Sequence, residues 1–459
     1  MKTFPIERIK QTLGVWRSSH EYQASQKRAA FTMLMLFVST VVVGADRKND
    51  RRFVESKGSE KSEQSKSARA SDVQSSKLRE RPQSGWLYVL DTNDMKSESQ
   101  VLLVDPEQER VIKTFTAGMA PDMALSTDGT RLYVAYTIYN SNGWGRKDFL
   151  EVIDTASGSV LKKITDADRW ISTVPQYPSS MTFSADGRWL YVFKHLQTSN
   201  TDTYFVATFD PYTNRFLPEK AMLRGCVSAT MLSSPKNQQL DVICSGTSDI
   251  QFLEPGSSGA AIAPAISDAI APLPKLSLRS KDVAEHGRRI GPSFLSSDGR
   301  TLTVIMGDGR LFEVNNESRD IMKTGAIDSG GEKTNNSSTK EAANVTDDGL
   351  AGSWIRNQAP VFSPDGAKVY LGIGRLVHLN QGVQSFDRVM VFDSRAFKRT
   401  ATIKTAYPFE SLALSRDGRY LYAISTEQAS IMVLDTADQG KIRTIYGIGR
   451  TPIRAIVAP

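Results

Sequence analysis

The sequence predicts an all-β protein: a seven-bladed β-propeller of four-stranded antiparallel blades, closed by a C-terminal strand that completes the N-terminal blade. Two observations lead to this prediction. A polar turn followed by an apolar strand recurs along the 459 residues, and a second apolar strand ending in an acidic or amide residue follows each copy. The first copy also lacks a preceding strand, and the last is followed by an extra one.

The first recurring phrase is a tight turn that leads into an alternating aromatic and aliphatic strand, as in S-R-D-G-R-Y-L-Y-A-I-S at 415–425. Gly adopts positive φ at no steric cost and Asp bonds the turn backbone, so the pair suits the hairpin between the two inner strands of a blade. Calcium binding by these Asp residues is the alternative. The clear turns are Asp128-Gly129, Asp186-Gly187, Asp298-Gly299, Asp365-Gly366 and Asp417-Gly418; Lys236-Asn237 is a degenerate copy, and the copy at 86–89 has no turn.

The second phrase supplies the third strand of each blade. An apolar strand ends at Asp105, Asp154, Asp210, Glu254, Asn315, Asp393 and Asp435. Short strands before the turns and after these residues complete units of four antiparallel strands, which we letter A to D from the axis outward.

The two ends of the chain predict how the ring closes. The first unit begins at its second strand, 86–90, and a strand at 453–457 follows the last complete unit. Pairing these segments would remove an open sheet edge. Deletion of residues 451–459 is therefore predicted to unfold or aggregate the propeller.

The N-terminal 83 residues differ in composition from the remainder. Six Lys and Arg in 1–28 precede an apolar run at 29–45, which is short for a transmembrane span and ends in Val43, Gly44 and Ala45. We interpret 1–45 as a signal peptide or an uncleaved signal anchor, so that the rest of the chain lies outside the cytoplasm, in the periplasm. Residues 46–83 are rich in Ser, Lys, Arg and Glu and predict a disordered tether, which leaves 84–459 for the propeller.

Charge adds little to the functional interpretation. Lys and Arg number 57 against 50 Asp and Glu, and both N-terminal segments contribute to this excess. The excess of basic residues is therefore not interpreted as a sign of nucleic-acid binding. Contact with a membrane is expected only if the leader is retained as an anchor.

One face of the propeller is predicted to carry the long loops. A–B and C–D turns share one face, and the A–B turns are short. The other face carries long B–C connections at 91–100, 137–149 and 375–388 and long D–A connections at 328–357 and from Pro255 into the 280s. Aromatic and Arg side chains on a loop-built surface suit a protein interface; the alternative is that each packs its own loop. The candidate interface residues are Trp144, Arg146, Trp170, Trp354, Phe386 and Arg388.

The sequence offers no motif for catalysis or metal binding. It contains four His, no H-E-x-x-H, no C-x-x-C and no acidic cluster with ligand spacing, so no catalytic, cofactor-binding or metal-ligating residue is predicted. Cys226 precedes one inner strand and Cys244 ends the next, which brings them to the same end of one sheet. In an exported protein a disulfide is favoured, and free thiols are the alternative.

The propeller resembles the heavy chain of methylamine dehydrogenase and related amine dehydrogenases over essentially 83–459. The residues that carry the resemblance are the long second B–C connection from Thr137, with D-F-L-E-V-I-D at 148–154, and the run from Arg169-Trp170 through Tyr177-Pro178 to Asp186-Gly187. The Cys226 and Cys244 pair, Gly352-Ser353-Trp354 and the strand 421–425 also look like that family.

The resemblance implies a periplasmic subunit that binds a small, disulfide-rich light chain. In that family the light chain carries tryptophan tryptophylquinone, which oxidises a primary amine to an aldehyde and ammonia, and the electrons leave to a small copper protein. With only two Cys, this chain is not expected to hold the quinone itself.

The resemblance also implies a residue in the amine channel, donated by the first B–C loop. The position that matches the family's aromatic residue is Met95. This departure leaves the shape of the channel open, although a flexible apolar Met could line a passage.

Two other functions remain open. A binding or scaffold propeller of the cell envelope fits the tether and the absence of catalytic motifs equally well. A self-sufficient hydrolase with a metal in the central pore is disfavoured by the lack of clustered His and acidic residues.

Overall fold

The computed structural model consists of strands and turns throughout its described part. It describes residues 84–92, 99–139, 145–166, 170–171, 179–197, 202–223, 226, 228–244, 249–253, 275–278, 290–306, 309–326, 359–373, 385–396, 398–438 and 440–459. The chain divides into the units Met1–Arg69 and Ala70–Pro459, and all described residues belong to the second. In these ranges no helix is long and apolar enough to cross a membrane.

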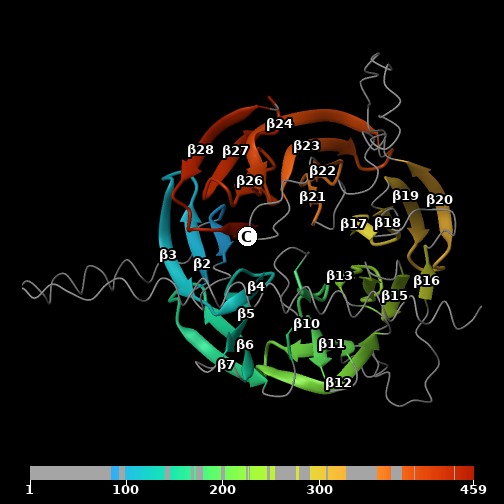
Figure 1. Ribbon diagram of the computed structural model, residues 1–459. Coiled ribbons are helices and arrows are strands. Elements are labelled where there is room, and N and C mark those ends of the chain that lie inside the picture. Colours follow the sequence, from blue (N-terminus) through green and yellow to red (C-terminus); the bar gives the residue numbers. More distant parts are fainter. Residues whose placement is uncertain are drawn as a thin grey trace, which may run out of the picture. The chain divides into compact units, whose positions relative to one another are not determined.

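Seven antiparallel sheets form the blades around one axis (Figure 1). Blade 1 has the order β29-β1-β2-β3, formed by Pro452–Val457, Leu87–Asp91, Gln100–Asp105 and Arg110–Thr116. Blade 2 contains β4 (Met119–Leu125), β5 (Arg131–Tyr139), β6 (Arg146–Asp154) and β7 (Val160–Asp166). In blade 3, β8 (Trp170–Ile171) and β9 (Met181–Phe183) both pair with β10 (Leu190–Gln197), followed by β11 (Asp202–Asp210) and β12 (Arg215–Leu223).

The remaining four blades keep the chain order from the axis outward. Blade 4 contains β13 (Ala229–Ser233), β14 (Leu240–Cys244), β15 (Asp249–Leu253) and β16 (Lys275–Ser277). Blade 5 contains β17 (Ile290–Leu295), β18 (Thr301–Met306), β19 (Arg310–Asn315) and β20 (Ile321–Ala326). Blade 6 contains β21 (Val361–Phe362), β22 (Lys368–Ile373), β23 (Phe386–Asp393) and β24 (Arg399–Phe409); blade 7 contains β25 (Ser411–Leu414), β26 (Tyr420–Ser425), β27 (Ser430–Asp435) and β28 (Lys441–Tyr446). The predicted seven-bladed propeller is confirmed.

The core lies between the blades. Successive side chains of a strand point to opposite faces, and both faces of each blade are covered by a neighbour. In β1, Tyr88 and Leu90 pack against blade 2, whereas Leu87 and Val89 pack against blade 7. Seven apolar clusters of this kind fill the seven junctions between consecutive blades, including the junction of blade 7 with blade 1. This double burial explains why the inner strands are almost continuously apolar.

The C-terminal strand closes the ring as predicted. β29 pairs antiparallel with β1, from Leu87 opposite Val457 to Leu90 opposite Arg454. Two backbone hydrogen bonds extend the pairing beyond the strands, from Gly85 N to Ala458 O (3.2 Å) and from Ala458 N to Trp86 O (2.7 Å). The first blade is therefore built from both ends of the propeller sequence.

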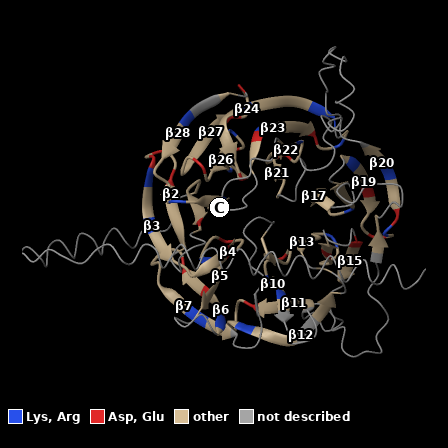
Figure 2. Ribbon diagram, viewed as in Figure 1, with Lys and Arg blue, Asp and Glu red and all other residues tan. Residues whose placement is uncertain are grey.

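The outermost strands of the blades are basic (Figure 2). The seven D strands contain Asp166 and Glu219 as their acidic residues, against Arg110, Lys113, Lys162, Lys163, Arg215, Lys220, Lys275, Lys323, Arg399, Lys404, Lys441 and Arg443. Each of these strands leaves one row of backbone groups unpaired, and charged side chains on such an edge discourage pairing with another molecule. Part of the basic excess of the chain thus protects sheet edges.

Candidate partner interface and buried polar sites

The A–B turns share one hydrogen-bonded arrangement, which explains the repeated Asp-Gly phrase. In the turn at 415–418 the Ser415 hydroxyl donates to Asp417 (2.5 Å) and accepts from the backbone N–H of Tyr420 (2.8 Å). Gly418 has φ +75°, the left-handed region that favours glycine. Ser126, Ser184, Ser296 and Ser363 make the same contact with Asp128, Asp186, Asp298 and Asp365. These Asp side chains therefore have a structural role, and we call the end of the propeller that carries them the turn face.

A second repeated contact joins the strand after the turn to the next blade. Burial raises the pKa of Tyr88, and the Thr155 hydroxyl of blade 2 lies close enough to lower it in part. Tyr370 and Thr436 have the same relation across blades 6 and 7. Thr155 also donates its hydroxyl to the carbonyl of Gly129 (2.7 Å), in the turn of its own blade.

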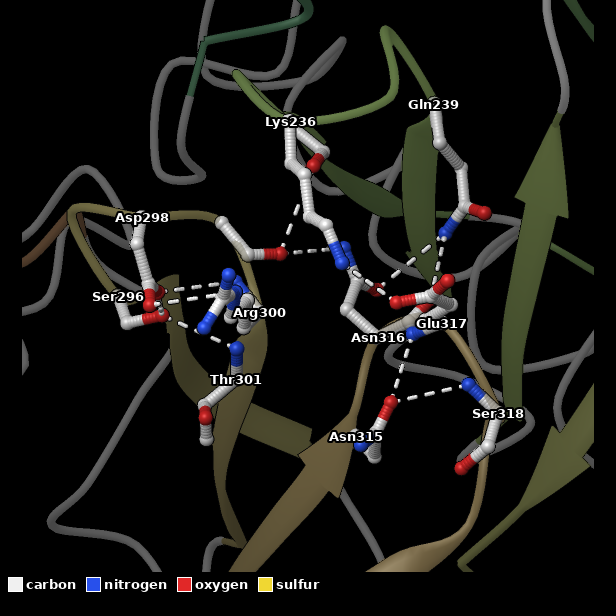
Figure 3. Close-up of polar contacts among 12 residues, drawn as sticks. Lys236, Gln239, Ser296, Asp298, Arg300, Thr301, Asn315, Asn316, Glu317 and Ser318 are labelled. Carbon is white, nitrogen blue, oxygen red and sulfur yellow. Dashed lines mark hydrogen bonds and ion pairs between the residues drawn. The ribbon is translucent and has the colours of Figure 1, made fainter.

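The junction of blades 4 and 5 departs from this pattern. Asp241 occupies the strand position that holds Tyr in five other blades, and Asn316 takes the place of the Thr. Gln239 donates to Asp241 Oδ1 (2.6 Å) and to Asn316 Oδ1 (3.2 Å), and Asn316 donates to Gly299 O (3.2 Å). Figure 3 shows Gln239 and Asn316 next to the Lys236–Glu317 ion pair (2.5 Å), with the Ser296 turn at the left.

Asp241 is a carboxyl group that the sequence analysis missed. It is fully buried, and its Oδ2 makes no hydrogen bond. Burial raises the pKa of Asp241 to about 7, while Gln239, Asn316 and the charge of Arg319 act in the opposite direction. The sequence signal was available, because an Asp at a position that is Tyr in five other repeats predicts a local polar substitution.

The opposite end of the propeller, which we call the loop-bearing face, contains the B–C and D–A connections. Its most prominent described feature is the hairpin of β5 and β6. The segment 137–149, predicted to be a long loop, continues the sheet as far as the pair Tyr139 and Arg146. That part of the prediction is wrong because Thr137, Asp148 and their neighbours keep the ladder register, and the connection shortens to 140–145.

Side-chain contacts make this hairpin rigid. Tyr136 donates to Glu151 Oε1 (2.6 Å), and Lys163 lies within 2.9 Å of the same carboxylate. The Lys163 ammonium group also lies 4.5 Å from the centre of the Phe149 ring, which stacks on Tyr136 at 5.4 Å. Burial, followed by the hydrogen bond to Glu151, raises the pKa of Tyr136 to about 12. Strands β5, β6 and β7 are thereby held together where the hairpin leaves the core.

The predicted interface residues are distributed unevenly. Arg146 begins β6 and pairs with buried Asp148 (2.9 Å), which also accepts from the Thr137 hydroxyl (2.6 Å). Trp170 lies in β8, and its side chain is outside the described part. Trp144, Trp354 and Met95 lie outside the described residues, so the predicted channel position stays a prediction.

Blade 6 provides the two remaining predicted interface residues. Phe386 is 5% exposed and packs on Phe409 with ring centres 5.7 Å apart, so it belongs to the core at the base of the loop-bearing face. Arg388 is half-exposed and forms an ion pair with Asp387 (2.8 Å). Both residues lie in β23, inside the segment 375–388 that was predicted to be a loop.

The two cysteines form the expected disulfide. Cys244 is opposite Ala229 in the β13–β14 ladder, and Cys226 lies just before that strand, with a Cα–Cα distance of 5.0 Å between the cysteines. The bond ties the first two strands of blade 4 together at the loop-bearing face. Among the described residues no group of three His, Cys, Asp or Glu is placed to hold a metal ion.

Two further carboxylates tie the N- and C-terminal parts of the ring. Asp91, at the start of the first B–C connection, accepts from the backbone N–H groups of Arg450 (2.9 Å) and Thr451 (2.6 Å) and from Gln100 (2.8 Å). On the inner strands, Asp122 forms an ion pair with Arg454 of β29 and accepts the Ser180 backbone N–H (2.6 Å). The Met95 loop therefore begins at a residue anchored to the closing strand.

Taken together, these observations define a closed seven-bladed β-propeller with a short-turn face and an elaborated face. Residues 84–203, from blade 1 into blade 3, match the family described as methylamine dehydrogenase heavy chain (MADH). The methylamine dehydrogenase heavy chain of Methylophilus methylotrophus is 22% identical over 379 residues, which cover 81% of this chain and 83% of that protein. The resemblance of this chain to the methylamine dehydrogenase heavy chain is confirmed.

Solved structures with similar folds support the architecture alone. A periplasmic gluconolactonase of Pseudomonas aeruginosa has a TM-score of 0.52 and 15% identity, covering 82% of this chain and 100% of that one. A putative 6-phosphogluconolactonase of Bacteroides fragilis has a TM-score of 0.50 and 13% identity, covering 81% of this chain and 98% of that one. At such low identity, only the fold is shared.

Proposed function

We propose that this chain is the large, noncatalytic subunit of a periplasmic quinoprotein amine dehydrogenase. The match of residues 84–203 to the heavy-chain family carries the proposal, because that segment includes the rigid β5–β6 hairpin of the loop-bearing face. A small light chain with tryptophan tryptophylquinone would supply the chemistry. A primary amine and water would give an aldehyde, ammonia, two protons and two electrons, and the electrons would pass to a small copper protein.

In this proposal the propeller supplies a docking surface. The β5–β6 hairpin ends in the partly exposed Tyr139 (43%), and its base is fixed by the ion pair of Arg146 with Asp148. A rigid aromatic and basic surface loses little conformational entropy on binding and suits a stable subunit interface. Met95, in the first B–C loop, would line the passage for the amine.

Export is part of the same proposal. The basic stretch and apolar run at 1–45 support either a cleaved signal peptide or a retained anchor, and the Cys226–Cys244 disulfide suits an oxidising compartment. N-terminal sequencing of the protein from a periplasmic extract distinguishes the two: a chain that begins near Asp46 indicates cleavage, and one that begins at Met1 indicates an anchor.

The proposal is tested by purifying the tagged chain from its own host. We expect a small, Cys-rich subunit to co-purify, together with visible absorbance of a quinone and dye reduction that depends on added primary amine. Purification of the propeller without a quinone subunit or amine-dependent activity would contradict the proposal. Recovery of other envelope proteins in that case would favour the scaffold function.

A pair of matched variants locates the interface. Tyr139→Ala on the loop-bearing face is expected to reduce recovery of the small subunit at least tenfold, the size of effect typical of an aromatic anchor. Tyr212 is 91% exposed in the C–D turn of blade 3, on the turn face, and Tyr212→Ala is expected to leave recovery unchanged. Equal losses in the two variants would place the interface elsewhere.

A further inference from the structure

The outer strands of blades 1 to 3 expose apolar side chains next to basic ones. In β7, Val160 is 53% exposed and Leu161 is 50% exposed, and the exposed Lys162 follows them. Tyr212, in the turn that leads into β12, is 91% exposed. Charged residues on an edge strand discourage pairing with another molecule, but this role does not require exposed apolar side chains beside them. The combination therefore needs a separate explanation.

Three cations accompany these apolar side chains. Arg110 at the start of β3, Lys162 in β7 and Arg215 at the start of β12 are all exposed. Within the described part of the chain, none of the three has an ion-pair partner. The acidic residues of the three C–D turns are Asp105, Asp154 and Asp210, which accept N–H groups of their own turns, Glu109, which pairs with Arg443, and the exposed Glu107. Positive charge therefore predominates on this edge.

The three strands belong to one rigid edge. Strands β3, β7 and β12 follow one another along the outer edge of the ring (Figure 1). Lys113 of β3 donates to the carbonyl of Ser157 (2.6 Å), in the turn before β7. Arg131 of β5 donates to the carbonyl of Pro211, in the turn before β12. Each of these turns is tied to the preceding blade, which fixes the exposed side chains relative to one another.

Tyr212 lies at the tip of such a turn. Asp210 accepts the backbone N–H of Tyr212 (2.8 Å) and the hydroxyl of Thr213 (2.8 Å), so the main chain of the turn is fixed. The Tyr212 ring has no aromatic or hydrogen-bonding partner among the described residues. A large amphipathic ring on a rigid turn suits an anchor, because little conformational entropy is lost when the ring is buried by a partner.

We propose that this edge binds the headgroup region of an anionic phospholipid bilayer. We call the surface the blade 1–3 rim; it consists of Arg110, Val160, Leu161, Lys162, Tyr212 and Arg215. The basic side chains would pair with lipid phosphates, while the aliphatic side chains enter the boundary of the acyl chains. A tyrosine ring, with its apolar body and polar hydroxyl, suits the boundary between the two.

The mixture of side chains favours a membrane over a protein partner. A protein interface has an apolar core from which charged residues are depleted, whereas here apolar side chains alternate with cations. A membrane accepts this mixture, because long basic side chains reach the phosphates while their apolar neighbours enter between the lipids. A second copy of the chain would bring the same cations together, and their repulsion opposes such a contact.

The rim does not depend on the proposed function. It lies beside the C–D turns and leaves the loop-bearing face free for a small subunit. Lipid binding by the purified chain therefore tests the rim, and co-purification of a small subunit tests the proposed function.

The experiment places a probe on the rim of the full chain, because the apolar run at 29–45 would itself bind vesicles. Tyr212→Cys is labelled with an environment-sensitive fluorophore and mixed with phosphatidylcholine vesicles that contain or lack phosphatidylglycerol. We expect stronger emission at shorter wavelength only with phosphatidylglycerol, and a loss of this change at high salt. Tyr139→Cys, labelled in the same way on the loop-bearing face, is expected not to respond. The native cysteines are buried in their disulfide and do not take the label.

Matched charge variants locate the contact. Arg110→Gln combined with Lys162→Gln, in the protein labelled at position 212, should raise the vesicle concentration needed for half the response roughly twentyfold, since each basic residue near an anionic membrane contributes about fivefold. Arg395→Gln combined with Lys398→Gln removes two exposed charges from the C–D turn of blade 6 and is expected to leave the response unchanged. Leu161→Ser tests the apolar part of the rim; it should weaken binding several-fold without lowering the melting temperature, because this side chain is half-exposed.

Four results would overturn the inference. They are the absence of a response to phosphatidylglycerol vesicles, equal responses with and without phosphatidylglycerol, equal responses of the probes at 212 and 139, and equal losses in the two pairs of charge variants. A response at 212 that needs no vesicles and grows with protein concentration would likewise contradict it, because a second copy of the chain would then cover the rim. Circular dichroism of each variant establishes that it is folded.

Discussion

At the scale of single residues, buried carboxyl groups set this propeller apart from a plain repetition of one blade. Asp241, Glu410, Asp122 and Asp91 each stand where a blade meets another blade or a loop, and each is held by hydrogen bonds. The four are not equivalent. Asp122 and Asp91 accept hydrogen bonds on both of their carboxylate oxygens, whereas Asp241 and Glu410 each keep one oxygen without a donor.

The pKa of Asp241 predicts a specific dependence of stability on pH. Because the folded-state pKa is raised from 3.8 to about 7, the native state binds this proton more tightly than the unfolded chain. The contribution to stability is therefore fully present below about pH 4 and is lost as the pH rises through 7. At 1.36 kcal/mol per pKa unit, the change is on the order of 4 kcal/mol.

Asp241→Asn, which cannot ionise, isolates this effect. We expect the variant to gain stability relative to the wild type between pH 5 and pH 8, as measured by urea unfolding at several pH values. Glu317→Gln is the control, because Lys236 lowers the pKa of Glu317 and the sign is reversed. Parallel pH profiles for Asp241→Asn and the wild type would show that Asp241 titrates normally.

At the scale of structural elements, the A–B hairpin turn is the unit that repeats. The Ser415 hydroxyl bonds both Asp417 and the N–H of Tyr420, and thereby fixes the turn and the start of β26 together. Ser415→Ala is expected to cost about 1 kcal/mol at pH 7, because the two hydrogen bonds are lost from a buried residue.

Unfolding at low pH tests the same hydrogen bond between Ser415 and Asp417. The Ser415 hydrogen bond is the largest cause of the lowered pKa of Asp417, so the stability it contributes is present at neutral pH and is lost as the pH falls below about 4. The stability difference between the wild type and Ser415→Ala should therefore be smaller at pH 3 than at pH 7, because only the hydrogen bond from the Tyr420 N–H remains in acid. A difference that does not change with pH would mean that the hydroxyl acts on the backbone alone.

The sequence predicted these elements well because their determinants are local. The turn phrase and the two apolar strands around it lie within about fifteen residues. The spacing of the apolar residues in these strands indicates directly which side chains are buried. The hairpin at 137–149 was mistaken for a loop because its polar residues, such as Thr137 and Asp148, bond each other across the ladder. Polar composition alone does not show such pairing.

The polar sites could not be predicted because their members come from distant segments. Glu410 meets Thr426 and Ser385, and Thr426 in turn bonds Pro452, so four connections contribute to one small region. The Asp122–Arg454 pair joins residues more than three hundred positions apart. Only the closed ring brings these groups together.

At the scale of the whole molecule, closure by β29 is the feature on which the other contacts depend. Ile453, Ala455 and Ala458 are buried, and Arg454 neutralises the buried carboxylate of Asp122. Deleting residues 451–459 would expose the edge of β1, leave Asp122 without its cation and remove the Thr451 backbone donor of Asp91. We expect the truncated protein to aggregate or to lose cooperative unfolding, because an open inner edge and an unpaired buried charge act together.

Arg454→Met separates the effect of strand pairing from the effect of the buried charge, because this variant keeps β29 and removes the positive charge. If pairing of β29 with β1 dominates, this variant should stay soluble and unfold cooperatively at a lower temperature, whereas the truncated chain should not. Melting followed by circular dichroism, with light scattering to detect aggregation, distinguishes them. A truncated protein that melts like the wild type would show that the ring is held by the six remaining blades and not by its terminal strand.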